Sequence, residues 1–312
     1  VWHEVLFYWQ DEFAHGISVP GLPGLCMGRN RNLSFSFTYG FMDTIDFFVE
    51  EIRGGQVREG EKFVPLSVRR EVISRKGKAD LVMNVMQSRN GVLEFPIDLD
   101  EVQQNSRNTK KKTEPSAGDW PKVADGFYLS RAWSQLETGA SETLEALAGL
   151  LVAQKVTQAQ SLTRKVLVSC NWLIADQAGN IGYQQSGLAP RRKSSGLFPL
   201  FGWEASNSWN GLVASDELTS YLNPPDGILV TANEDWNRAG HKALINASMG
   251  DCRGSRIRKL IQQTSKHNVE SLQKIQTDIF SEHAARHLGD WGKYIPKGPL
   301  KSILDGWDKK YD

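Results

Sequence analysis

A polar corner at residues 38–46 holds the first side chains whose types and spacing could do chemistry. It reads TYGFMDTID and follows a stretch, 33–38, in which apolar and small hydroxyl residues alternate as in a strand. A strand that ends beside a glycine leaves backbone N–H groups unpaired, so the N–H of Tyr39 next to Gly40 could donate to a developing oxyanion. A plain turn after a strand gives the same pattern, and the spacing leaves both interpretations open.

Two carboxylates in this corner have a possible use of their own. Asp43 and Asp46 lie three residues apart, and with the carbonyl of Ile45 they could hold a hard cation such as calcium, which binds about six to eight oxygens. Apolar residues also recur at helical spacing over 45–52. That pattern predicts a helix with Asp43 as its N-cap and Asp46 in its first turn. Calcium binding and helix capping are therefore alternatives.

An amide and a guanidinium further along the chain extend the set of candidates. Asn233 closes the apolar segment 228–233, ILVTAN, for which we predict a strand. A side-chain amide at a strand end is a fixed donor that suits an oxyanion, and it also suits a turn. Arg253 lies at the start of a predicted helix, where it could fix a carboxylate, orient an amide or simply face solvent. His283 and His287 are four residues apart but suggest no third zinc ligand.

The elements that would position these groups follow from hydrophobic periodicity and from turn residues. We expect a strand-rich part, a flexible polar loop, a helix, a second set of strands with a hairpin, and a helical part, at residues 1–100, about 103–122, 141–165, 166–233 and 253–312. Strands, a helix, more strands and then helices predict the α+β class, with a sheet sandwich covered by helices inside one domain.

Composition limits the classes of function. The chain has 312 residues, of which 40% are hydrophobic and 23% charged, and its net charge is +1. A nearly neutral chain favours neither nucleic acid nor a membrane surface as partner, even with the lysine run at 110–112. No apolar run approaches the ~18 residues of a membrane span, so we expect none. The three cysteines have no metal-ligand spacing and predict no metal site of their own.

Taken in order, four segments resemble the penicillin acylase family, which belongs to the N-terminal-nucleophile hydrolases. The segments are PGLPGLCMGRNRNLSFSFTYGFMDTIDFFVE, NWLIADQAGNIGYQQSGLAPRR, DGILVTANED, and RGSRI followed by IQTD. The resemblance runs from about Val19 to Asp278 and implies the αββα fold of these hydrolases, here partial, without the nucleophile strand and the C-terminal part. It implies hydrolysis of a linear amide in a penicillin, a cephalosporin or an N-acyl homoserine lactone. It also implies a periplasmic or secreted protein.

The resemblance assigns roles to particular residues. The backbone N–H of Tyr39 and the side chain of Asn233 match the family's oxyanion donors, and Arg253 matches its active-site arginine. A structural calcium ion would be held by the side chains or carbonyls of the following residues: Asp43, Ile45, Asp46 and Pro199. The family's remaining aspartate ligand has no match in the segment 240–251, GHKALINASMGD.

The family's nucleophile is the new N-terminal Ser, or sometimes Cys, that an internal cut of the precursor exposes, and its own α-amino group accepts the proton. The first residue here is Val1, which has neither hydroxyl nor thiol. We therefore expect this chain alone to be inactive. The nucleophile would lie on a small subunit or on a missing N-terminal segment of the same precursor, with a small-molecule amide as substrate. The alternative is a non-catalytic binding or scaffold protein that retains the acylase core.

Overall fold

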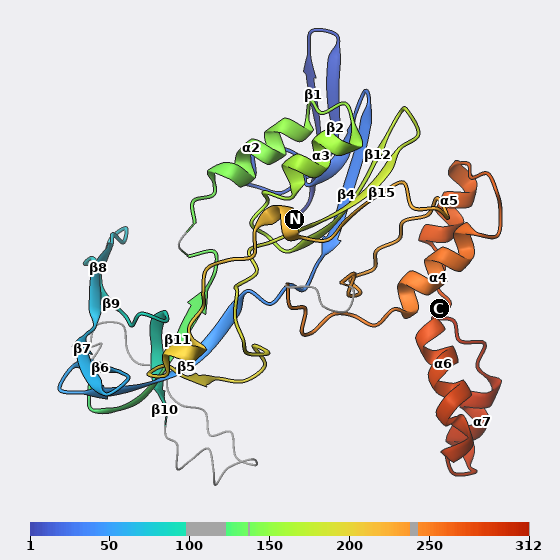
Figure 1. The fold of residues 1–312 in the computed structure, drawn as a ribbon. Helices are drawn as coiled ribbons and strands as arrows, with labels where there is room; N and C mark the ends of the chain where they lie inside the picture. Colours follow the sequence, from blue (N-terminus) through green and yellow to red (C-terminus); the bar gives the residue numbers. More distant parts are fainter. Residues whose placement is uncertain (98–122, 137, 238–242, 312) are drawn as a thin grey trace.

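The computed structural model describes residues 1–97, 123–136, 138–237 and 243–311, and the predicted polar loop at 103–122 lies outside them. A seven-stranded antiparallel sheet contains the start of the chain and the predicted hairpin, in the order β1-β2-β3-β4-β12-β13-β15 (Figure 1). Its strands are β1 (His3–Trp9), β2 (Glu12–Ser18), β3 (Met27–Asn30), β4 (Leu33–Tyr39), β12 (Cys170–Asp176), β13 (Ile181–Ser186) and β15 (Ser220–Leu222).

One face of this sheet is buried, and β4 shows why. Leu33 and Phe35 are each 3% exposed, whereas Ser34 and Ser36 between them are exposed. Because successive side chains of a strand point to opposite faces, the alternation in the sequence sets which face is apolar. The strand predicted from this alternation is confirmed.

Two helices, α2 (Ser141–Leu150) and α3 (Val156–Thr163), cover the apolar face. The prediction of one continuous helix over 141–165 is wrong. The amide of Asn30 donates to the carbonyls of Leu150, Leu151 and Ala153 at 3.2, 3.2 and 2.8 Å. A side chain that supplies donors to the last carbonyls of a helix allows the helix to end there.

A second sheet contains the remaining strands of the described residues, in the order β7-β6-β5-β11-β10-β9-β8, and β14 pairs in parallel with β5. Its strands are β5 (Ile45–Arg53), β6 (Gln56–Glu59), β7 (Lys62–Pro65), β8 (Ser67–Ile73), β9 (Leu81–Gln87), β10 (Val92–Ile97), β11 (Gly126–Trp133) and β14 (Leu200–Phe201). In Figure 1 this sheet lies beside the first one, and each sheet has its own apolar cluster. The α+β class with antiparallel sheets is confirmed, but among the described residues the two sheets are not stacked as a sandwich.

The prediction of a helix over 45–52 is wrong, because these residues form the central strand β5. Residues 48–52 are buried on both faces of the strand, so the apolar residues do not alternate with exposed ones. A continuous buried run of this kind fits helical spacing by chance. Since no helix begins here, helix capping cannot be the role of Asp43 and Asp46.

The chain crosses from one sheet to the other in a short link after β4. The N–H of Gly40 donates to the carbonyl of Ser169 at 3.0 Å, which holds the link against β12. A Cβ at Gly40 would lie 2.7 Å from Ser169 Oγ and 3.2 Å from the backbone of Cys170, so this position has no room for a side chain. Met42 then forms an isolated β-bridge with Ile245, and Asp43 follows two residues before the beginning of β5.

The C-terminal part is helical, as predicted. Its helices are α4 (Cys252–Ile261), α5 (Val269–Gln276), α6 (Glu282–Trp291) and α7 (Pro299–Gly306). Asn268 caps α5 as expected, because its side chain accepts from the N–H of Ser271 at 2.9 Å. No helix in the described part of the chain is both long and apolar enough to cross a membrane.

The segment 228–233 is not a strand, which corrects a further prediction. Two of its backbone carbonyls accept hydrogen bonds from side chains of α4 instead of from a neighbouring strand. Arg258 donates to the carbonyl of Ile228 at 3.3 Å, and Arg253 donates to that of Ala232 at 2.5 Å. These bonds satisfy two backbone acceptors of the segment without a sheet ladder.

Candidate active site

The open edge at the end of β4 brings Tyr39 and Asn233 together. The side-chain amide of Asn233 donates through Nδ2 to the carbonyl oxygen of Tyr39 at 3.0 Å. The two residues are 194 positions apart in the chain, so the contact depends on the tertiary fold.

The register of the sheet shows where the N–H of Tyr39 points. Tyr39 lies opposite Cys170 of β12, while the next residue, Gly40, donates to the carbonyl of Ser169. Tyr39 and Cys170 are therefore a non-hydrogen-bonded pair, and both backbone groups of Tyr39 point away from β12. On that side β3 pairs with β4 at Phe35 and Ser34, near its beginning. The N–H of Tyr39 thus points to the same edge of β4 as the Asn233 amide, past the end of the pairing with β3.

Arg253 fixes the orientation of the Asn233 amide. Its Nη2 donates to Asn233 Oδ1 at 2.9 Å and to the carbonyl of Ala232 at 2.5 Å. Since Oδ1 accepts from the guanidinium, Nδ2 must be the atom that faces Tyr39. An amide nitrogen carries two hydrogens, and the bond to Tyr39 uses one of them. Among the described residues, no second acceptor bonds to this nitrogen, so its other N–H could donate to a further oxygen.

The backbone of Asn233 is held in an uncommon conformation. Its φ is +71°, a left-handed value that Asn adopts more readily than most residues. The carbonyl of Asn233 accepts from the N–H of Met249 at 3.0 Å, and Thr231 bonds to Thr38 of β4 through their hydroxyls at 2.7 Å. The segment that carries the amide is therefore held at Asn233 and at Thr231, two residues earlier.

The arrangement suits stabilisation of a negatively charged oxygen. It combines a backbone N–H at a strand end with a preorganised amide N–H, and the guanidinium behind the amide favours negative charge in front of it. The structure brings all three residues of the predicted catalytic set together: Tyr39, Asn233 and Arg253. Their catalytic role remains a prediction. The contacts described around Asn233 include no N-terminal nucleophile.

The carboxylates of the predicted calcium segment are engaged by a third side chain, Arg192. Its Nη2 lies 3.1 Å from Asp43 Oδ2, and its Nη1 lies 2.5 Å from Asp46 Oδ2. The side chains of Arg192 and Asp46 are 1% and 2% exposed, and that of Asp43 is 13% exposed. Pro199 immediately precedes β14, whose Leu200 pairs with Phe48, so it lies beside the beginning of β5.

This donor set does not fit a calcium ion. Calcium binds about six to eight oxygens, and here N–H groups fill positions around the carboxylates instead. Trp209 Nε1 donates to Asp46 Oδ2 at 2.6 Å, and Asn246 Nδ2 donates to Asp43 Oδ2. Among the residues that the structure describes, no group of three or more His, Cys, Asp or Glu side chains could hold a metal ion.

Comparison with known proteins gives the family. A model of the penicillin amidase family matches residues 1–312. The chain belongs to the penicillin amidase family. This confirms the resemblance inferred from the sequence segments.

Individual relatives support the same assignment. The acyl-homoserine lactone acylase QuiP of Pseudomonas fluorescens (strain Pf0-1) is 31% identical over 307 residues, which are 94% of this chain and 34% of that protein. The penicillin acylase 2 proenzyme of Pseudomonas sp. (strain SE83) is 27% identical over 313 residues, 95% of this chain and 36% of that protein. The chain thus spans about a third of the length of these relatives.

A solved structure shows the same fold. The thermostable penicillin G acylase from Alcaligenes faecalis superposes with a TM-score of 0.75 at 20% identity, over 99% of this chain and 54% of that one. At this identity the likeness supports the fold of the penicillin amidase chain and not its substrate.

Three residues around Asp43 and Asp46 were not found by sequence reasoning: Arg192, Asn246 and Trp209. Arg192 and Asn246 lie 149 and 203 residues from Asp43 in the chain, so no local pattern connects them. Asn246 belongs to the segment 240–251, which offered no carboxylate match for the family's remaining ligand. The structure places a neutral amide there.

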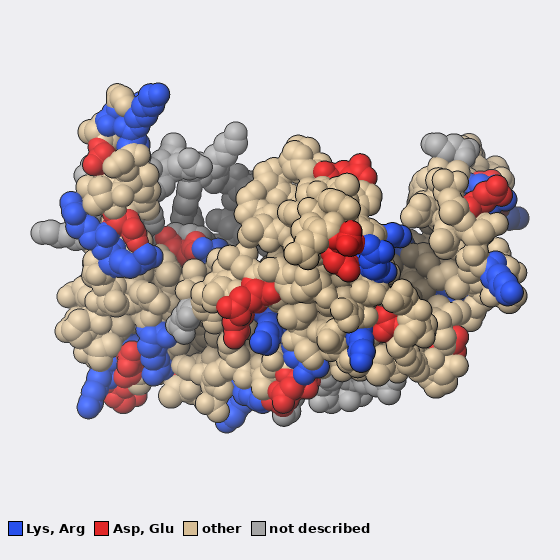
Figure 2. All heavy atoms as spheres, turned by 90° about the horizontal axis from the view of Figure 1, so that it is seen from above, with Lys and Arg blue, Asp and Glu red and all other residues tan. Residues whose placement is uncertain are grey.

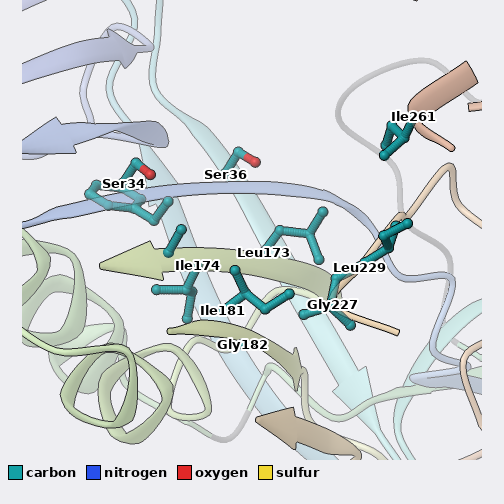
Figure 3. Close-up of a pocket in the computed structure, with 12 residues that line it drawn as sticks. Ser34, Ser36, Leu173, Ile174, Ile181, Gly182, Gly227, Leu229 and Ile261 are labelled. Carbon is teal, nitrogen blue, oxygen red and sulfur yellow. The ribbon is translucent and has the colours of Figure 1, made fainter. Parts of the chain in front are cut away.

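A hollow of about 400 Å³ lies on the face of the first sheet opposite to α2 and α3. Figure 3 shows it between Ser34 and Ser36 of β4, Leu173 of β12 and Ile181 of β13, with Ile261 of α4 on the far side. Its lining is mainly aliphatic, and a hollow of this kind suits an apolar ligand or packed side chains. It follows the same strand that ends at Tyr39.

On the face of the described residues that Figure 2 shows, charges of both signs are mixed. Figure 2 shows Lys and Arg side chains interspersed with Asp and Glu over one face, in keeping with a net charge of +1. Mixed charge of this kind gives no long-range attraction to a polyanion.

Proposed function

We propose that the full-length protein hydrolyses a linear amide bond and that this chain supplies the site that stabilises the tetrahedral intermediate. The observation that carries the proposal is the pair of donors at one edge of β4. The N–H of Tyr39 and the Nδ2 of Asn233 face that edge, and Arg253 holds the amide from behind. A carbonyl oxygen placed there would gain negative charge next to two fixed N–H donors.

In this proposal an N-terminal Ser or Cys outside this chain is the nucleophile. Its hydroxyl or thiol attacks the carbonyl carbon, and its own α-amino group takes the proton and returns it to the leaving amine. Water then releases the acyl group from the ester or thioester. The nucleophile would be exposed by autoproteolytic cleavage of a precursor, and one relative is itself named a proenzyme. A small subunit or an N-terminal segment of the same precursor would carry the missing strand.

The proposed substrate class is drawn from the relatives' names, which include penicillin acylases and acyl-homoserine lactone acylases. We infer that the substrate is an N-acylated small molecule, either a β-lactam or a homoserine lactone. We also propose that the protein is exported to the periplasm or secreted, where such substrates are encountered.

The test is an assay of the full-length protein against a chromogenic phenylacetyl anilide, penicillin G and a long-chain acyl homoserine lactone, with release of the amine as readout. We expect turnover of at least one substrate by the processed protein and none by residues 1–312 alone. Replacement of the N-terminal Ser or Cys by Ala should abolish turnover. Absence of turnover on all substrates, with the fold intact, would favour a non-catalytic binding protein.

A further inference from the structure

The corner between the two sheets has a built-in cation. Arg192 places one nitrogen of its guanidinium against each of the two carboxylates, Asp43 and Asp46. Its Nη2 also donates to the backbone carbonyl of Asp43 at 3.1 Å. Since the Arg192 side chain is only 1% exposed, water can screen these contacts very little. The guanidinium is thus committed to this corner.

Neutral donors complete the shell around the carboxylates. Asn246 Nδ2 donates to Asp43 and also to the carbonyl of Ser195 at 2.7 Å. Two acceptors next to the same atom fix the orientation of this amide, because the opposite orientation would set three oxygens against one another. Asp46 receives the indole N–H of Trp209 at 2.6 Å. The neighbours of the carboxylates are therefore donors, and a metal ion needs oxygen acceptors there.

The backbone of the neighbouring loop packs closely against the same ion pair at Gly196. Gly196 has a φ of +73°, and a Cβ at this residue would lie 2.4 Å from Asp43 Oδ2 and 2.8 Å from Arg192 Nη2. The backbone of the loop thus approaches the ion pair more closely than any residue with a side chain would allow.

We propose that Arg192 is the resident cation of this corner, so that the native protein binds no calcium at Asp43 and Asp46. The guanidinium neutralises the carboxylates and fixes the beginning of β5. The same segment is tied to its surroundings by the N–H of Asp43, which donates to the carbonyl of Leu244 at 2.8 Å. This inference concerns the metal requirement and goes beyond the proposed amide hydrolysis.

The test compares calcium binding by the full-length protein with that of its Asp43→Asn variant, using equilibrium dialysis. We expect both to bind the same amount of calcium and the melting temperature of the unmodified protein to stay unchanged in excess EGTA. Loss of one calcium equivalent in Asp43→Asn would overturn the proposal. So would a melting temperature that falls by several degrees in EGTA for the unmodified protein but not for an Asp46→Asn variant.

A second arm removes the guanidinium. We expect Arg192→Met to melt at a lower temperature, to recover part of the loss in millimolar calcium, and to lose that recovery in the double variant with Asp43→Asn. Arg192→Lys is the matched control, because it keeps a positive charge that repels a divalent ion but lacks the planar fork of the guanidinium. It should melt at a lower temperature and show no response to calcium. An Arg192→Met variant that is folded and gains no calcium response would contradict exclusion of the ion by the guanidinium.

Discussion

Removal of the Asn233 amide tests the proposed oxyanion site most directly. Nδ2 is a side-chain donor at the edge where the N–H of Tyr39 points, and loss of one such donor typically lowers kcat by about 100- to 1000-fold, or about 2.7–4 kcal/mol. In the full-length protein, we expect Asn233→Ala to show this loss with little change in KM. The reason is that the interaction strengthens only when the substrate oxygen becomes negatively charged.

The backbone conformation of Asn233 supplies a matched control. At a φ of +71° alanine is strained by about 1–2 kcal/mol, whereas glycine adopts the conformation freely. Asn233→Gly therefore removes the amide without the strain. We expect both variants to lose kcat equally and to lose the bonds to Tyr39 and Arg253, and alanine to lower the melting temperature more than glycine does because of the added strain. The assay is amine release under saturating substrate, with thermal melting of the same samples.

The two variants separate the competing explanations. If Asn233→Gly kept a kcat near that of the unmodified protein while Asn233→Ala lost activity, strain would explain the loss and the amide would be only a turn residue. That result would refute the oxyanion assignment.

Three other outcomes follow from contacts in the same chain and apply to the full-length protein. Arg253→Met should lower kcat about 10-fold, which is less than the loss from removal of the Asn233 amide, because the guanidinium positions Asn233 through one hydrogen bond from a charged group. Arg253→Lys should recover part of this loss in kcat. The paired Arg256 guanidinium lowers the pKa of Asp278, so the stability from this pair is present above about pH 4 and is lost as the pH falls through the lowered pKa. Thermal melting of Asp278→Asn should therefore show a stability deficit of about 1 kcal/mol at pH 6 that shrinks below pH 4. A deficit that is independent of pH would contradict the linkage. Burial raises the pKa of Cys170 to about 12, so iodoacetamide at pH 8 should leave it unmodified in the native protein and label it after unfolding, as measured by peptide mass spectrometry.

Local patterns predicted those elements in which one face is apolar and the other polar. The alternation from Leu33 to Thr38 predicted β4, and Asn268 predicted the start of α5. The pattern failed where both faces are buried, as in β5 at residues 48–52, because the period that distinguishes a strand from a helix is then absent. It also failed at the end of α2, where the helix stops because of the side chain of Asn30, about 120 residues earlier in the chain.

The candidate site was predicted from the sequence by family resemblance and not by a local pattern. Tyr39, Asn233 and Arg253 were found because their segments resemble those of a known family, and no single spacing identified them. Arg192 could not be assigned in this way. A family pattern indicates which residues take part in a known arrangement, whereas a replacement partner for two carboxylates becomes visible only when the fold brings it to them.

The guanidinium at the corner between the sheets has a consequence for where this protein can be made. The positive charge of Arg192 is part of the polypeptide, so every molecule carries one. No cation has to be taken up from the surroundings to provide it. Under the proposal that Arg192 is the resident cation, the corner folds without alkaline-earth ions, and a chelator does not destabilise it. A mutation of the Arg192 codon removes this positive charge from every molecule, whereas a chelator cannot remove it.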